Sequence, residues 1–328
     1  RTDSRDHLAT TVQEALAAGR RIHYLPCYRS DQLLILSRLL ALSPDQVNAG
    51  ASQAFIKTVV SQRSVKTADE VTEIESALGL CRKLFQALLN HMRQENNAVA
   101  LAGILEGIAK AAGRRFAFTP IITNHGEILH NQPDNYPFNP GDLLLMDIGV
   151  ESREHYASDI TRTIPANGQF SARQKEIYDI VLAAQKTAIA QAVPGLRFMD
   201  LHRRAATIIC EGLRDLGLMK GAVEDAVQEG AHALFFPHGL GHMLGLDAHD
   251  MESLGEDNVG YDHTTVRSDQ FGLASLRLGR CLEENFVVTV EPGIYFIPAL
   301  MDQWRQDRRW SSFIAFDKLE AYRRFGGI

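Results

Sequence analysis

The feature that most constrains the fold is a pair of carboxylates placed in two neighbouring apolar stretches within residues 143–164. Asp147 follows the run Leu143–Met146, and Asp159 lies within Tyr156–Ile160, which predicts two adjacent strands of a hairpin. An Asp near the end of a strand usually caps a turn, but a buried carboxylate without a partner costs several kcal/mol. The cost of burying two carboxylates close together is most simply offset by a divalent cation.

A glycine-rich segment, Pro237–Asp250, carries three histidines at His238, His242 and His249. Its glycines allow a close approach of the backbone to a ligand. The spacing of the first two histidines resembles a helical zinc pair, but Gly239 stands where that motif has Glu, and the glycines disfavour a helix. We therefore expect loop or strand geometry, with one His as a metal ligand and the others on the substrate.

A third segment ends in an acidic residue. Glu291 closes the β-type run Phe286–Val290, and Pro292-Gly293 turns the chain directly afterwards. After such an apolar run we expect the Glu side chain to point into a site. Asp, Asp, His and Glu then follow one another in chain order, and this ligand set suits divalent cations that activate water. The sequence therefore predicts a metal-dependent hydrolase.

Taken together, these segments resemble those of the pita-bread metallopeptidases, in the proline-specific branch of Xaa-Pro dipeptidase (prolidase) and aminopeptidase P. The resemblance extends from about Arg63 to the end of the chain. It rests on the sequences DIG…YASDITRT, HGLGHMLGLDAHD, LRLGR and VEPGIYF. It implies an α+β pita-bread fold, and the alternation of helical and strand patterns likewise predicts helices packed on one side of a curved antiparallel sheet.

The resemblance implies a ligand set for two metal ions. Asp147 would chelate one ion, Asp159 would bridge both, and His242 and Glu291 would hold the second. The ions are expected to be manganese, with cobalt or zinc as alternatives, because carboxylate-rich ligation with one His suits all three.

Further residues are assigned to catalysis and substrate binding by the same resemblance. Glu291 would orient or deprotonate the water, and His249 would contact the scissile carbonyl and the developing oxyanion. His130, in the sequence EILHN, matches a histidine on the substrate side. His238 would line the proline pocket, and Arg277 would lie near the substrate carboxylate.

The implied reaction is hydrolysis of the peptide bond before proline by a water that bridges two divalent cations. An Xaa-Pro dipeptide is the first expected substrate, because the long stretch between His249 and Glu291, with Arg277 inside it, is more similar to prolidase. Three alternatives remain open. The chain could be an aminopeptidase P acting on longer peptides, a pita-bread binding module without catalysis, or a creatinase-like C–N hydrolase without metals.

The chain departs from the family pattern in three places. A further metal-binding Glu is expected soon after an FGG-type segment, but the sequence ends at Phe325–Ile328. We therefore expect a chain that ends at Ile328 to bind metal weakly or at one site. The hairpin around Glu151–Glu154 is expected to carry one extra residue, and Phe116 stands about where prolidases carry a tyrosine.

The organisation of the chain changes near residue 64. Residues 1–63 are expected to be the remnant of a smaller N-terminal domain, and residues 64–328 a catalytic domain truncated at its C-terminal end. Because the first residue is Arg, an upstream signal or domain stays open. Helices are expected over Asp31–Leu42 and about Ala98–Ala112, with a loop around Ser43–Ser52.

Three further helices are predicted by their starting residues. Thr67 and Glu70 form a capping box before an amphipathic helix, and Ser171 opens a helix that runs to about Ala192. Asp200 is expected to cap a fourth helix.

Composition limits the kinds of binding partner and the cellular location that we expect for the protein. The net charge of −6 gives no basic footprint for nucleic acid, and no apolar run is long enough to span a membrane. The four cysteines are scattered without a C-x-x-C pair, which predicts reduced thiols in a cytoplasmic protein. The expected partners are a proline-containing dipeptide or short peptide and a second copy of the chain in a homodimer.

Overall fold

The structure, a computed structural model, describes residues 5–92 and 94–328. Their Cα atoms group into two compact units. The first unit extends to Ser64 and includes Met251–Val259, and the second comprises Val65–Asp250 and Gly260–Ile328. Every residue assigned above to a metal or a substrate belongs to the second unit. The functional assignment of residues 1–63 and 64–328 to two domains stays a prediction.

The described part of the first unit is helical. Its elements are α1 (Arg5–Ala17), α2 (Ser30–Leu40), α3 (Pro44–Ala49), α4 (Gln53–Ser64), η2 (Glu252–Leu254) and most of α10 (Glu256–Gly260). The expected loop around Ser43–Ser52 was wrong, because it contains α3. The Ser43 side chain accepts from the backbone N–H of Gln46, the Gln46 side chain accepts in return, and Pro44 opens the helix with its fixed φ.

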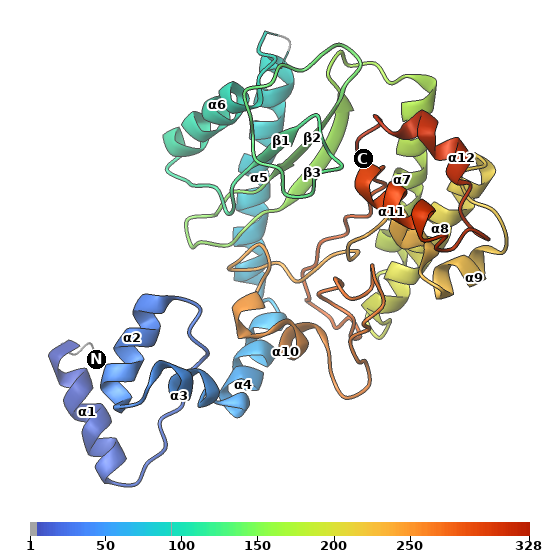
Figure 1. Cartoon of the computed structure of the whole chain (residues 1–328). Coiled ribbons are helices and arrows are strands. Elements are labelled where there is room, and N and C mark those ends of the chain that lie inside the picture. The colour runs from blue at the N-terminus through green and yellow to red at the C-terminus, as the bar shows by residue number, and fades with distance from the viewer. Residues whose placement is uncertain (1–4, 93) are drawn as a thin grey trace. The chain divides into compact units, whose positions relative to one another are not determined.

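The second unit contains a small antiparallel sheet. In the described residues its strands are β1 (Ile121–Thr123), β2 (Leu143–Ile148) and β3 (Ile160–Pro165), in the order β1-β2-β3. The helices α5 (Ala68–His91) and α6 (Ala98–Ala111) cover one face of this sheet (Figure 1).

Alternation along β2 explains the two faces of the sheet. Leu144, Met146 and Ile148 are buried against α5 and α6. Since successive side chains of a strand point to opposite faces, Leu145 and Asp147 point to the other face. The helices α5 and α6 thus bury one face and leave the carboxylate face to the site. Phe116 packs into the same core.

The predicted capping boxes of the long helices are confirmed. Thr67 and Glu70 cap α5, and Ser171 and Gln174 cap α7 (Ala172–Gln191). The remaining helices of the second unit are α8 (Phe198–Asp215), α9 (Val223–Gln228), η1 (Ala231–Leu234), α11 (Pro298–Gln306), α12 (Phe316–Leu319) and η3 (Glu320–Tyr322).

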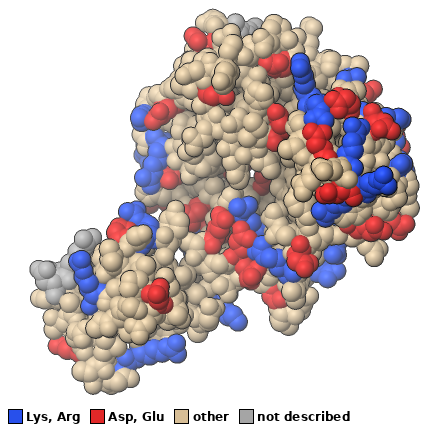
Figure 2. Space-filling model, viewed as in Figure 1, with Lys and Arg blue, Asp and Glu red and all other residues tan. Residues whose placement is uncertain are grey.

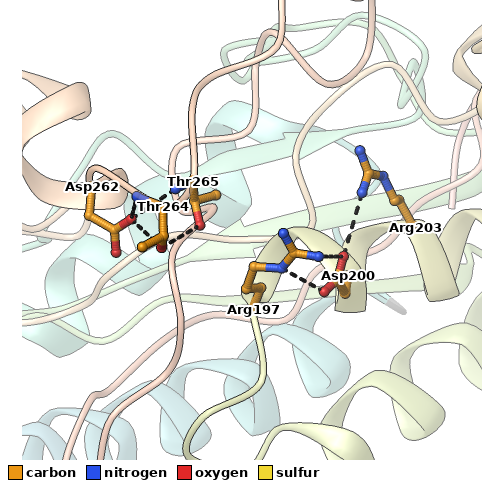
Figure 3. A network of polar contacts seen from close by, with 6 residues as sticks. All are labelled: Arg197, Asp200, Arg203, Asp262, Thr264 and Thr265. Atoms are coloured by element: carbon orange, nitrogen blue, oxygen red, sulfur yellow. Dashed lines mark hydrogen bonds and ion pairs between the residues drawn. The ribbon is translucent and has the colours of Figure 1, made fainter.

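The predicted cap of α8 was wrong. This helix begins two residues before Asp200, and the N–H groups of Phe198 and Met199 donate to the carbonyl oxygens of Arg280 and Gly279. Backbone acceptors therefore replace a side-chain cap. Asp200 lies in the first turn instead, where it pairs with Arg197 and Arg203 (Figure 3). Figure 3 also shows a turn in which Asp262 accepts from Thr264 and Thr265.

The surface charge is mixed in sign. Lys and Arg side chains are interspersed with Asp and Glu over the face seen in Figure 2. None of the described helices combines the length and the apolar character needed to cross a bilayer. All four cysteines of the sequence are free thiols.

Candidate metal centre

Seven of the eight predicted site residues line one cavity of about 350 Å³ in the second unit. They are His130, Asp147, His238, His242, His249, Arg277 and Glu291. The eighth, Asp159, lines a neighbouring cavity of about 620 Å³, which shares Leu145, Thr161, Glu291 and Tyr295 with the first. The fold therefore brings together residues that lie up to 161 positions apart in the sequence.

The register of the hairpin places the two aspartates on one face. Asp147 pairs with Thr161 across the β2–β3 ladder, and Asp159 lies two residues before Thr161. Because side chains alternate along extended chain, Asp159 points to the same side as Thr161 and Asp147. The prediction that Asp159 lies inside a strand was wrong, since β3 begins at Ile160.

Glu291 does not close a regular strand as expected. Residues 287–291 are extended and lie antiparallel to residues 240–244, with hydrogen bonds from Leu244 N–H to Val287 O, Thr289 N–H to His242 O and Glu291 N–H to Leu240 O. The N–H of His242, however, donates to the Thr289 hydroxyl at 3.0 Å and not to a carbonyl. This side-chain contact interrupts the reciprocal ladder, so only the isolated bridge of Met243 with Val288 forms.

His242 lies between two carboxylates. Its Nε2 atom is 3.1 Å from Glu291 Oε1 and 3.5 Å from Asp159 Oδ2. Its Nδ1 atom is 2.9 Å from the carbonyl oxygen of Met243, which can only accept a hydrogen bond, so Nδ1 carries a proton. This leaves Nε2 as the atom that faces the acidic residues. The Thr289 hydroxyl donates to Glu291 Oε1 at 2.8 Å.

The electrostatics of the cluster show an excess of buried negative charge. Burial and the nearby charges of Asp159 and Glu291 raise the pKa of Asp147 well above its ordinary value. Although burial favours the neutral imidazole, Asp159 and Glu291 raise the pKa of His242 to about 10. Burial opposes ionisation of Glu291, but its hydrogen bond to His242 lowers its pKa to about 2. The raised pKa values mean that protons on Asp147 and His242 balance part of the negative charge of the carboxylates.

The donor set fits a divalent cation. Asp147 Oδ1 is buried without a hydrogen-bond partner, a costly state for a carboxylate oxygen that a metal bond would relieve. Three carboxylates and one imidazole with a fixed Nδ1 proton are donors that such ions accept. Among the described residues, no three His, Cys, Asp or Glu side chains already enclose a metal position. A metal ion would therefore have to displace the contacts that His242 now makes with its two carboxylates.

Three predicted residues surround this cluster within the cavity. The His249 ring lies 4.3 Å from the His242 ring, edge to face. His130 is exposed and has a left-handed backbone with φ of 58°. Arg277 is half-buried at the cavity wall.

His238 presents an apolar ring to the cavity. Its Nδ1 atom lies 2.8 Å from the carbonyl oxygen of Gly239 and must therefore carry a proton. Its Nε2 atom then accepts from the hydroxyl of Tyr295 at 3.0 Å. Both nitrogens are occupied, and burial lowers the pKa of His238. The neutral His238 ring thus forms part of the cavity wall.

The sequence reasoning missed three residues that lie beside the predicted site residues. Thr161 lies directly opposite Asp147 in the hairpin, the Thr289 hydroxyl donates to Glu291, and the Tyr295 hydroxyl donates to His238. All three lie within four residues of an assigned ligand. Thr161 could have been found from the hairpin register, because it lies directly opposite Asp147.

Gly241→Ala is expected to destabilise the second unit by about 1–3 kcal/mol, because a Cβ atom there would lie 2.1 Å from the carbonyl oxygen of Thr289. Urea unfolding followed by fluorescence measures this, since both tryptophans, Trp304 and Trp310, lie in that unit. Gly107→Ala is the control. It lies on exposed α6 surface with open space around it and should gain about 0.5–1 kcal/mol. Equal stability of both variants would contradict the tight packing at Gly241.

Comparison with known proteins identifies relatives of this chain. Residues 72–323 match the profile of metallopeptidase family M24. The chain is 40% identical over 223 residues to a human Xaa-Pro dipeptidase, covering 66% of this chain and 44% of that protein. It is 36% identical over 279 residues to a probable Xaa-Pro aminopeptidase from Fusarium vanettenii, covering 84% and 57%. The chain thus spans about half the length of these curated relatives.

Solved structures of aminopeptidase P share the fold. The Escherichia coli enzyme with the inhibitor Pro-Leu matches 74% of this chain and 52% of its own, with a TM-score of 0.63 and 32% identity. The zinc-substituted E. coli enzyme in complex with product matches 88% and 64%, with a TM-score of 0.69 and 28% identity. The predicted α+β pita-bread fold is confirmed by these likenesses.

Proposed function

Because the chain belongs to metallopeptidase family M24, we propose that it hydrolyses the peptide bond before proline, with Xaa-Pro dipeptides as the first substrate class. Relatives of both specificities support a proline-directed peptidase, since they are named Xaa-Pro dipeptidase and Xaa-Pro aminopeptidase. Action on longer Xaa-Pro peptides is the alternative.

One observation carries this proposal. The cavity gathers Asp147, His242 and Glu291, and Asp159 reaches His242 from the hairpin beside it. Within this group a buried oxygen of Asp147 lacks a partner. Such a set of carboxylates around one imidazole has little structural use without a cation to balance it.

Asp147, Asp159, His242 and Glu291 are the residues that would hold divalent metal, with manganese as the proposed ion and zinc or cobalt as alternatives. When bound, such a metal polarises the scissile carbonyl and lowers the pKa of water. As a carboxylate, Glu291 can accept a hydrogen bond from the attacking water.

The other cavity residues would bind and orient the peptide. His249, beside His242, is placed to donate to the carbonyl oxygen as negative charge develops on it. The neutral ring of His238, fixed by Tyr295, offers an apolar wall for the proline ring. Arg277, at the cavity wall, would contact a substrate carboxylate.

The test is metal titration of the full-length protein by calorimetry, followed by assays on Gly-Pro and Gly-Pro-Ala. We expect metal-dependent release of proline from Gly-Pro in preference to hydrolysis of the tripeptide. Metal binding without hydrolysis of either peptide would favour a binding module, and preference for Gly-Pro-Ala would favour the aminopeptidase.

Arg277→Ala is expected to raise the KM for Gly-Pro by roughly 10- to 150-fold. The reason is the loss of a charge-assisted contact worth about 1.5–3 kcal/mol. Gly-Pro-Ala, whose carboxylate lies beyond proline, should be affected much less. Arg280→Ala is the matched control, because Arg280 lies on the same segment but stacks on Phe286 outside the cavity lining. Equal losses on both peptides would assign Arg277 to the scaffold.

Manganese as the native ion, a homodimer and a cytoplasmic location are the finer parts of this proposal. Metal analysis after purification, light scattering and cell fractionation test them separately.

A further inference from the structure

A buried ion pair involves Asp250, the residue that follows the cavity residue His249. Lys66 Nζ is 3.0 Å from Asp250 Oδ2, and each side chain is only 1% exposed. Taking two charges out of water is costly, and a buried pair is often no more stabilising than apolar residues of the same volume. Stability alone therefore does not explain the Lys66–Asp250 pair.

Lys66 is fixed by its backbone as well as by its charge. Its N–H donates to the carbonyl oxygen of Asn285 at 2.8 Å, and the next residue, Thr67, caps α5. The ammonium group is therefore attached to the start of a 24-residue helix whose Ile74 packs in one cluster with Leu244. The position of Lys66 is therefore fixed by the start of α5.

Asp250 closes the loop Met243–Asp250. Its N–H donates to Met243 O at 3.0 Å, and its Oδ1 accepts from the N–H of Asp247 at 3.4 Å. Gly245 lies so close that a Cβ atom there would be 2.4 Å from Asp250 Oδ2. The carboxylate thus fills the inside of the loop, and the backbone N–H of Asp250 joins the two ends of the loop.

His249 and His242 lie at the two ends of this closed loop. The residue directly before Asp250 is His249, whose ring is held 4.3 Å from that of His242. We propose that Lys66 and Asp250 are positioning residues, which fix the His249 imidazole against the metal-binding cluster. This inference rests on the proposed function, because it gives His249 its role at the scissile carbonyl.

The test compares Lys66→Met with the double variant Lys66→Met/Asp250→Asn. The single variant removes the cation that pairs with the buried Asp250 carboxylate and should lose stability. The double variant removes both charges of the pair and should regain most of that stability. With saturating metal, we expect the double variant to keep a kcat about ten- to a hundredfold below that of the unmodified chain, with little change in KM, because His249 is no longer held in place.

A second measurement does not depend on activity. Isotope-labelled histidine in the metal-free chain allows the His249 ring signals to be followed by NMR, with assignment by His249→Gln. We expect these signals to broaden or split in the double variant. If the unmodified chain hydrolysed neither peptide, the proposed function would fail, and the NMR comparison would still decide the positioning role.

Leu105→Ala is the control for lost stability alone, because Leu105 is fully buried on α6 away from the cavity. It should lower the thermal midpoint while kcat and the His249 signals stay unchanged. A double variant with normal His249 signals would show that the ion pair is merely structural. A normal kcat in that variant, from an active enzyme, would show the same.

Discussion

Asp159→Asn, in the full-length protein, is expected to abolish the proposed metal-dependent hydrolysis of Xaa-Pro peptides while the fold remains intact. In the structure Asp159 faces His242 and adds to the negative charge that raises the pKa of Asp147. The amide side chain of Asn is neutral and cannot balance the charge of a cation. Loss of outer-shell partners of metal ligands already costs about 10–100-fold, so we expect the loss of a residue proposed as a direct ligand to cost about a hundredfold or more.

The substitution should leave the fold stable, because the repulsion that it removes between Asp159 and Asp147 offsets the lost attraction to His242. Circular dichroism and metal titration, measured alongside the Gly-Pro assay, separate loss of metal from loss of fold. Asp179→Asn, on the exposed face of α7, is the matched control and should retain activity. Near-normal activity with full metal occupancy in Asp159→Asn would remove Asp159 from the ligand set.

Much of the fold could be predicted because its signals are local. The capping boxes at Thr67 and Ser171 set the starts of α5 and α7 within a few residues of chain. The apolar run before Asp147 predicted the buried strand β2. The same kind of signal at Ser43-Pro44 was overlooked, and it would have predicted α3.

The parts that could not be predicted depend on contacts between distant segments. Backbone acceptors at Gly279 and Arg280 cap α8, and no pattern near Asp200 reveals them. The Thr289 hydroxyl interrupts the ladder beside His242, so a sequence rich in β-branched residues forms no regular strand. Lys66 and Asp250 are 184 positions apart. Residue types can indicate such partners only once the fold has brought them together.

Two buried histidines are expected to make the second unit lose stability in acid. His202 on α8 and His232 on η1 are 0% and 1% exposed, and their rings lie 5.9 Å apart. Within the described residues, none of their four ring nitrogens has a hydrogen-bond partner. Burial lowers the pKa of His232 to about 4. Burial, with the charges of His232, His238 and Arg203, lowers that of His202 well below its usual value.

The sign of the effect follows from proton binding. The unfolded chain binds protons at these histidines below about pH 6.5, whereas folded His232 stays neutral until about pH 4. Neutral burial therefore contributes its full stability above pH 6.5 and loses it progressively as the pH falls towards 4. For His232 alone the loss amounts to about 3 kcal/mol, since one pKa unit corresponds to about 1.4 kcal/mol.

Urea unfolding at pH 7.5 and pH 4.5, followed by tryptophan fluorescence on the metal-free chain, measures this loss. His232→Phe keeps an apolar ring against His202 but cannot be protonated, so its stability should fall less than that of the unmodified chain between the two pH values. His263→Gln, at an exposed position, controls for the removal of any histidine. Because the carboxylates of the proposed metal site are present in both chains, only the difference between the chains reports on His232. Parallel losses in the unmodified chain and His232→Phe would mean that the buried pair takes no part in acid unfolding.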